Sequence, residues 1–243
     1  MTRLLGFFLT HRTLALVRWD LHFVLVRASN ALRFKRRRVA RRLSAVNPRF
    51  LNLGSGPRGI ASDEWINVDG WQDRNVHLAV DLNRRLPFSD NQFAGIFSEH
   101  VFEHFDLNQG ESILRECWRI LQPGGCIRLI VPDGEKIIRA YLENPTELAA
   151  RRCIESGFAI DAVNSYFRQR YEHQYIYDWP MLKNQLLRAG FAAVERVDYR
   201  KGSASRQLML DDQKYAWESL YVEAVKPLTH DGVLSRENRG SCG

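Results

Sequence analysis

The chain has 243 residues, of which 45% are hydrophobic, 26% charged and 11% aromatic. This ordinary globular composition excludes a disordered or fibrous chain, and the length suits one α/β domain with an insertion. The apolar runs are too short to cross a bilayer unaided. The four cysteines form no CxxC pair, so we expect no zinc ribbon or disulfide framework, and a reducing, cytoplasmic compartment.

The net charge of +7 is concentrated in an N-terminal arm, residues 1–46. The arm holds eleven Lys and Arg against one acid, Asp20, so its formal charge is +10 and the rest of the chain carries −3. Apolar residues recur in the arm at steps of three and four, which predicts a helix with one apolar stripe. The stripe consists of Leu14, Val17, Leu21, Val24, Ala28 and Ala31.

Three interpretations of the arm remain open. The stripe could pack against the domain and leave the basic run 33–42 in solvent. Alternatively, the stripe could lie in the inner membrane face with its arginines on anionic headgroups, a peripheral contact. A basic run without a readout element makes nucleic acid an unexpected partner. A cleaved signal peptide is disfavoured because Arg12, Arg18 and Asp20 interrupt the apolar region.

From Phe50 onward, short β-rich runs alternate with turns and helical stretches, as in an α/β sheet. We expect strands at 49–53, 65–69, 76–80, 93–98, 126–131, 192–199 and 218–225. One helix should precede the turn Pro123-Gly124-Gly125, and another should follow Asp178 and end at Gly190. The domain spans 47–226, with a helical insertion or lid at 134–180 and a loose tail at 227–243.

A glycine turn follows the first expected strand, in the segment Leu51-Asn52-Leu53-Gly54-Ser55-Gly56-Pro57-Arg58-Gly59. Its glycines match the spacing of the dinucleotide fingerprint, GxGxxG. That fingerprint also needs a helix whose N-terminus faces a pyrophosphate, and only residues 60–64 precede the next strand. A nucleoside ligand without phosphates therefore fits better than NAD.

Two acids follow the next strands. Asp69 ends the second strand, where a carboxylate can accept hydrogen bonds from a ribose diol. Asp81 follows the third strand and could accept from an adenine amino group, with Leu82 near the ring. Open α/β sheets bind ligands at these strand ends, so the acids favour a binding site over a plain turn.

The succession LNLGSGPRG, WINVDG, DLNRRLPFSDNQFAGIFSEHVFEHF and RILQPGGCIRLIVPD resembles class I S-adenosylmethionine-dependent methyltransferases. It is most similar to predicted methyltransferases of polysaccharide and glycan gene clusters. The resemblance is strong over residues 50–135, continues weakly to SLYVEAVK and excludes the arm. It implies a doubly wound, mostly parallel seven-stranded sheet of the Rossmann-like kind, carrying a helical insertion and an N-terminal helical arm.

The resemblance also implies roles for individual residues. The cofactor S-adenosylmethionine would lie on the glycine loop, Gly54, Ser55 and Gly56. Asp69 matches the acid that binds the ribose hydroxyls in the family. Asp81 and Leu82 match the residues that contact the adenine ring. Ser98 and Glu99 match the fourth strand end beside the methionine moiety. The family's helix between the first two strands is missing, and the arm is a candidate to cover that face.

The segment Glu99-His100-Val101-Phe102-Glu103-His104 places two imidazoles beside this site. H-x-x-E-H is also a metalloprotease signature, but zinc hydrolysis needs a third ligand on a helical scaffold, and this cluster directly follows a strand; we therefore expect no metal. A hydroxyl acceptor needs its proton removed, which suits histidine. The candidate bases are His104, then His100, then Asp133 after the fifth strand; each could instead only hydrogen-bond the loop.

The insertion carries aromatic residues mixed with Arg168, Arg170 and His173, which could hold a sugar or an anionic acceptor. Its aromatic residues are Phe158, Tyr166, Phe167, Tyr171, Tyr175, Tyr177 and Trp179. We expect the phenylalanines to form the insertion's own core, and His173 is a further candidate base. The sequence predicts methylation, on oxygen, of a small-molecule or glycan acceptor, free or lipid-linked. A nicotinamide-dependent oxidoreductase and a non-catalytic scaffold remain as alternatives.

Overall fold

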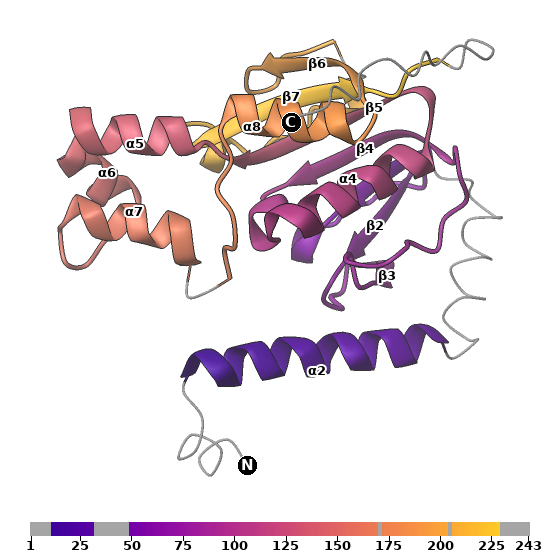
Figure 1. Ribbon diagram of the computed structural model, residues 1–243, viewed down its shortest axis with the longest axis horizontal. Coiled ribbons are helices and arrows are strands. Elements are labelled where there is room, and N and C mark those ends of the chain that lie inside the picture. Colours follow the sequence, from indigo (N-terminus) through magenta and orange to yellow (C-terminus); the bar gives the residue numbers. More distant parts are fainter. Residues whose placement is uncertain (1–10, 32–48, 170–171, 204–205, 229–243) are drawn as a thin grey trace, which may run out of the picture.

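The computed structural model describes residues 11–31, 49–169, 172–203 and 206–228 (Figure 1). Outside them lie the start of the arm, its basic run 33–42, most of the tail, and Arg170 and Tyr171 of the insertion. Predictions that concern those residues stay predictions. None of the described helices is long and apolar enough to span a membrane.

A seven-stranded sheet forms the centre of the molecule, in the order β3-β2-β1-β4-β5-β7-β6. Its strands are β1 Phe50–Leu53, β2 Trp65–Asp69, β3 Leu78–Ala79, β4 Phe93–Glu99, β5 Leu121–Pro132, β6 Ala192–Val197 and β7 Ser219–Val225. Only β7 runs antiparallel to its neighbours, β5 and β6. The chain order reverses between β1 and β4, and α/β sheets bind ligands beside such a point. The predicted Rossmann-like methyltransferase fold is confirmed.

Two amphipathic helices, α4 Leu107–Ile120 and α8 Trp179–Arg188, cover one face of the sheet. Asp106 caps α4 in a reciprocal capping box with Gln109, and Asp178 caps α8 through the Met181 N–H. Both helices match the predictions. The turn at 123–125 lies within β5, which begins earlier than expected, directly after α4.

Short segments cover the opposite face, where the three-residue 3₁₀ turn η1 (Gly56–Arg58) stands in for a crossover helix. Leu208, in the 3₁₀ turn η4 (Arg206–Leu208), packs there with Phe50 and Tyr221. The fully buried Arg128 pairs with Asp211 and Glu223 and fixes the segment before β7 to the sheet. This segment packs on that face, whereas α2 (His11–Ala31), the described part of the arm, contacts Gly70, Trp71 and Asp81.

The predicted insertion is helical and comprises α5 Gly134–Glu143, α6 Pro145–Arg151 and α7 Ala159–Arg168. Its own small core consists of Ile137, Leu148, Ala162 and Tyr166. The expectation that its phenylalanines fill this core is wrong, because Phe158 and Phe167 are exposed. Tyr166, which is 1% exposed, occupies this core instead.

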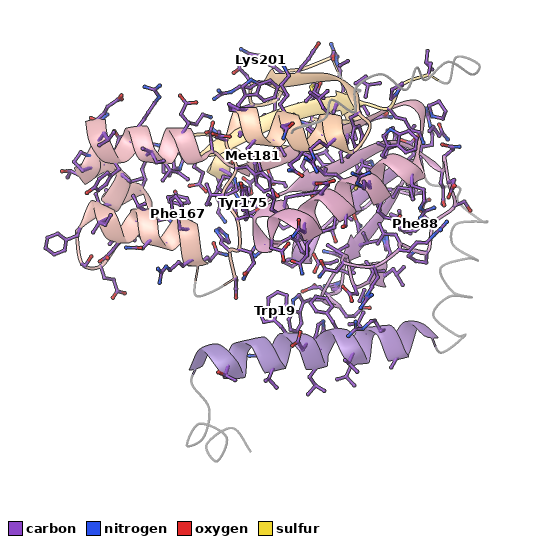
Figure 2. The ribbon with its side chains drawn as sticks, viewed as in Figure 1. Trp19, Phe88, Phe167, Tyr175, Met181 and Lys201 are labelled. Atoms are coloured by element: carbon purple, nitrogen blue, oxygen red, sulfur yellow. The ribbon has the colours of Figure 1, made fainter. Side chains whose placement is uncertain are left out.

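The arm forms one described helix, α2 His11–Ala31, which lies along the molecule near β2 and β3 (Figure 1). Its aromatic side faces the domain: Trp19 packs edge-on against Trp71, and His22 stacks on the same indole. Figure 2 shows Trp19 on the side of the helix toward the sheet. Of the three interpretations of the arm, the one in which the aliphatic stripe packs against the domain does not fit, since Val17, Leu21 and Val24 are exposed.

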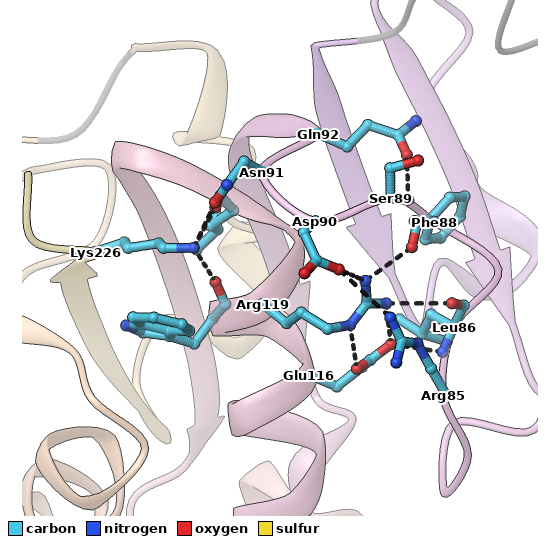
Figure 3. Close-up of polar contacts among 12 residues, drawn as sticks. Arg85, Leu86, Phe88, Ser89, Asp90, Asn91, Gln92, Glu116, Arg119 and Lys226 are labelled. Atoms are coloured by element: carbon cyan, nitrogen blue, oxygen red, sulfur yellow. Dashed lines mark hydrogen bonds and ion pairs between the residues drawn. The ribbon is translucent and has the colours of Figure 1, made fainter. Parts of the chain in front are cut away.

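Ion pairs and hydrogen bonds join the segments at the amino edge of β4 and β5 (Figure 3). Arg119, near the end of α4, donates to the carbonyls of Leu86 and Phe88 and pairs with Asp90 and Glu116. Lys226, after β7, donates to Asn91 Oδ1 and to the carbonyls of Trp118 and Leu121. This network closes the edge of the sheet that lies opposite the carboxyl ends of the parallel strands.

Candidate functional site

A cavity of about 720 Å³ lies at the carboxyl ends of β1, β2 and β4. This volume is typical of small-molecule sites. The strand ends supply one wall, the insertion and Tyr215 supply the wall opposite, and α2 contributes Arg18, Trp19 and Phe23. The site therefore joins segments that are far apart in the sequence.

The glycine loop enters the cavity directly after β1. Gly54 and Gly56 have φ angles of +72° and +53°, a region that favours glycine. A Cβ on Gly54 would come within 2.1 Å of Val101 Cγ2, whereas one on Gly56 would meet nothing within 4 Å. Gly54 therefore allows close packing on Val101, and Gly56 leaves open space on the cavity side. Ser55 also lines the cavity, and its N–H donates to the Val68 carbonyl.

Asp69 lies at the end of β2 and faces the glycine loop. Its Oδ2 accepts from the Gly56 N–H and its Oδ1 from the Trp71 N–H, both at 2.8 Å. Each carboxylate oxygen keeps a further lone pair for a ligand hydroxyl. The structure thus places Gly54, Gly56 and Asp69 together, as the ribose assignment requires.

Of the two residues predicted to contact adenine, only one lies in the cavity. Leu82 lines the cavity, but Asp81 does not. The buried Asp81 carboxylate accepts from the Asn83 N–H and lies 3.5 Å from Arg27 of α2. The structure therefore gives Asp81 a role in holding α2, and it does not support a direct contact with adenine.

Of the two residues expected beside the methionine moiety, again only one lines the cavity. Ser98 is buried away from the cavity, whereas Glu99 lines it and accepts from the Asp212 N–H. Burial raises the pKa of Glu99. A cationic ligand group beside Glu99 would favour its charged form. The open glycine loop, the diol-accepting Asp69 and the acid at Glu99 together fit S-adenosylmethionine, which carries ribose hydroxyls, an ammonium and a sulfonium.

His100 is held on the protein side of the cavity. Its backbone has φ +54°, unusual for a residue other than glycine. Its Nδ1 lies 3.2 Å from Glu103 Oε1 and its Nε2 2.9 Å from Ser219 Oγ. With both ring nitrogens engaged, His100 is better placed to orient Glu103 than to accept a proton from an acceptor.

His104 lines the cavity, and among the described residues no hydrogen bond to its Nε2 is found. Its Nδ1 donates to the Glu172 carbonyl at 3.2 Å, because a carbonyl can only accept, and this leaves Nε2 with its lone pair. His173 is oriented in the same way by the Tyr166 carbonyl. The two rings are nearly perpendicular, with centroids 4.9 Å apart. Burial lowers the pKa of His173, so its ring is neutral near pH 7.

Glu103 lies beneath this pair of imidazoles and is 1% exposed. Burial by itself would raise its pKa, but the hydrogen bond from His100 and the neighbouring His104 and His173 lower it. The Glu103 carboxylate acts against the burial that lowers the pKa of His173, but burial is the larger effect. Ligand atoms of Glu103, His104 and His173 all lie within 4.8 Å of one another, so among the described residues this trio could also hold a metal ion.

Asp133, the third candidate base, is not part of the cavity lining. Its side chain caps α5 by accepting from the N–H groups of Glu135 and Lys136, and it pairs with Arg196 at 3.0 Å. The acid is 1% exposed. The prediction that Asp133 acts as a base is therefore wrong, because the start of the insertion uses this strand-end carboxylate as a helix cap.

Sequence reasoning missed several residues of the cavity. Trp19 and Phe23 come from α2, and Lys214, Tyr215 and Glu218 come from the segment before β7. Glu218 accepts from the Tyr166 hydroxyl and so joins the insertion to β7. No motif marks these residues, since only the tertiary fold brings them to the strand ends.

A family model described as a methyltransferase domain matches residues 64–129, from the start of β2 into β5. The match supports a methyltransferase. It covers less than half of the chain, and it includes Asp69, Glu99 and the His/Glu cluster. This match supports S-adenosylmethionine as the cofactor, as the sequence predicts. No curated protein matches the chain.

Several solved structures share the fold at low identity. A putative methyltransferase in complex with the Trm112 activator of Haloferax volcanii is 15% identical, with TM-score 0.46, over 88% of this chain and 98% of that one. Phosphoethanolamine N-methyltransferase 2 of Haemonchus contortus with S-adenosyl-L-methionine is 15% identical, with TM-score 0.46, over 74% and 49%. A SAM-dependent methyltransferase of Archaeoglobus fulgidus is 14% identical, with TM-score 0.43, over 80% and 94%. None of these likenesses carries an argument about the acceptor.

Proposed function

We propose that this protein transfers a methyl group from S-adenosylmethionine to a hydroxyl oxygen of a glycan or small-molecule acceptor. One observation carries the proposal: the same cavity is lined by Asp69, whose carboxylate faces the glycine loop, and by His104, whose Nε2 has no partner among the described residues. The first suits a nucleoside cofactor. The second suits an acceptor that must lose a proton.

The residues around His104 fit the role of general base. S-adenosylmethionine supplies an electrophilic methyl group and leaves as a neutral thioether. As the acceptor oxygen bonds the methyl carbon and the carbon–sulfur bond breaks, the hydroxyl proton passes to His104 Nε2. The Glu172 carbonyl holds the ring in the required tautomer, and the Glu103 carboxylate stabilises the imidazolium that forms.

The site also argues against a nicotinamide cofactor. A dinucleotide pyrophosphate is held at the N-terminus of a crossover helix. Here only the three-residue turn η1 follows the glycines. The Tyr215 ring, which packs against His100 and lines the cavity, suits a sugar or another flat polar acceptor.

Calorimetric titration with S-adenosylmethionine, with NAD as the control ligand, tests the cofactor. Binding of the first alone supports the proposal, and binding of NAD alone would revive an oxidoreductase. Binding of neither would favour a scaffold. Release of S-adenosylhomocysteine with hydroxylated sugars and their amine analogues then tests oxygen as the target. Activity lost with a chelator and restored by a divalent ion would replace the base by a metal at the trio of Glu103, His104 and His173.

A further inference from the structure

Helix α2 has two apolar sides, and only one of them is covered. On the inner side, Phe23 packs against Gly70, where an added Cβ would lie 3.2 Å from the ring, and His22 donates to the Gly70 carbonyl at 2.8 Å. Trp19 contacts Trp71 and lines the cavity, and Val26 is buried. This side attaches α2 to the end of β2 and makes it the roof of the cavity.

The outer side carries four large aliphatic residues in solvent. Val17, Leu21, Val24 and Leu25 are 50%, 57%, 49% and 60% exposed. Their spacing of three, four and seven residues places them in one continuous stripe. Single exposed hydrophobic residues are common on proteins, but a stripe of this kind marks an interaction surface. None of the described residues covers it.

Charge indicates what the stripe meets. Helical spacing of about 100° per residue places the exposed residues Arg18 and Arg27 on opposite sides of the stripe. Asp20 is the only acid in residues 1–46, whose formal charge is +10, while the rest of the chain carries −3. An apolar stripe in a strongly basic segment matches an anionic lipid surface, because its aliphatic groups can enter the acyl boundary while the positive charge of the segment attracts the headgroups.

We propose that α2 lies in the surface of an anionic membrane through Val17, Leu21, Val24 and Leu25, and that the cavity it roofs accepts a lipid-linked hydroxyl compound. The second part rests on the proposed methyl transfer. Because the inner side of α2 lines the cavity, membrane binding brings the cavity to the headgroup level, where a lipid-linked glycan is presented. An acceptor fixed to the same surface needs no search in solution.

Flotation of the full chain with vesicles tests the membrane part. The vesicles are equimolar phosphatidylglycerol and phosphatidylcholine, with pure phosphatidylcholine for comparison. The double variant Leu21→Gln/Leu25→Gln should lower binding to the anionic vesicles at least tenfold, because it replaces two of the four apolar side chains that would leave water for the acyl boundary. Its affinity for S-adenosylmethionine without vesicles should be unchanged, since neither leucine lines the cavity.

The exposed apolar residues of α5 provide a matched control. Ile138 and Leu142 are 49% and 72% exposed and lie on the insertion. Ile138→Gln/Leu142→Gln should leave vesicle binding within twofold of wild type. Equal binding of the α2 variant and wild type would overturn the proposal, as would an equal loss in the α5 variant.

A separate readout distinguishes this proposal from the methyl transfer on which it partly rests. The protein is incubated with S-adenosylmethionine labelled in the methyl group and with bacterial membranes, and the label is then partitioned into organic solvent. Label in the lipid fraction supports a lipid-linked acceptor, and label only in the aqueous fraction overturns it. If no cofactor binds while flotation still depends on the α2 leucines, the methyl transfer fails and the membrane helix stands.

Discussion

The two edges of the parallel sheet use charged residues in opposite ways. At the amino edge, Arg119 and Lys226 donate to carbonyls of other segments and so join them (Figure 3). At the carboxyl edge, Asp69 and His104 are held by backbone groups and still present a free lone pair to the cavity. Both edges are ordered by hydrogen bonds, but only one retains capacity for a ligand.

This contrast indicates how stability and function are separated in the molecule. Substitutions at the amino edge should change the free energy of unfolding and leave ligand binding unchanged. Substitutions at the carboxyl edge should do the reverse. The predictions below test this separation.

The largest effect is expected at His104. His104→Gln keeps a side chain that can donate to the Glu172 carbonyl but cannot take up a proton. We expect kcat with a hydroxyl acceptor to fall by about 10²- to 10⁴-fold, while the Kd for S-adenosylmethionine stays within twofold. A quenched time course of S-adenosylhomocysteine formation gives kcat, and calorimetry gives the Kd. An unchanged kcat would remove His104 as the base.

Arg119 tests the opposite edge. Arg119→Met leaves the Glu116 carboxylate and two carbonyls without their main donor, and we expect a loss of about 2–3 kcal/mol in the free energy of unfolding. Arg115→Met is the matched control, because Arg115 pairs with Glu111 on the exposed side of the same helix and should cost less than about 1 kcal/mol. Urea denaturation measures both. A weaker cofactor affinity in a folded Arg119 variant would contradict the separation.

Asp69 should affect binding more than folding. Asp69→Ala removes the acceptor for ribose hydroxyls, and we expect the Kd for S-adenosylmethionine to rise more than tenfold, which is about 1.4 kcal/mol. Asp73→Ala is the control, because Asp73 lies in the following loop outside the cavity lining. Calorimetry on both variants decides the point. Equal Kd values for the two variants would contradict the ribose assignment.

The cofactor half of the site was predictable because a simple rule governs it. Ligands lie at the carboxyl ends of parallel strands, and Gly54, Gly56 and Asp69 follow strands that alternating apolar runs already marked. Asp133 shows the limit of the rule: it also ends a strand, but the helix that follows uses it as a cap.

The acceptor half could not be predicted, because its parts meet only in the tertiary fold. Glu172 and His173 reach His104 from the insertion, and no spacing in the sequence pairs them. Sequence periodicity also could not decide which side of α2 packs against the domain. Periodicity finds the aliphatic stripe but cannot tell which of two apolar sides packs, and the stacking of His22 on Trp71 favours the aromatic side.

The smallest expected effect concerns pH. Burial lowers the pKa of His173 below its ordinary 6.5, so below that pH the unfolded chain binds more protons than the native protein at this residue. The free energy of unfolding should therefore fall as the pH drops from 7 toward 5. Glu103 acts in the same direction at lower pH, since its pKa lies below the ordinary 4.5 and its contribution is lost as it protonates.

His173→Gln removes the titrating ring and keeps a donor for the Tyr166 carbonyl. Its Tm should decline less steeply than that of wild type between pH 7 and pH 5, as measured by differential scanning calorimetry. Parallel curves for the two proteins would show that His173 is not buried as a neutral ring. A flatter plot of Tm against pH for the variant would show that the buried neutral imidazole of His173 lowers the stability of the protein in acid.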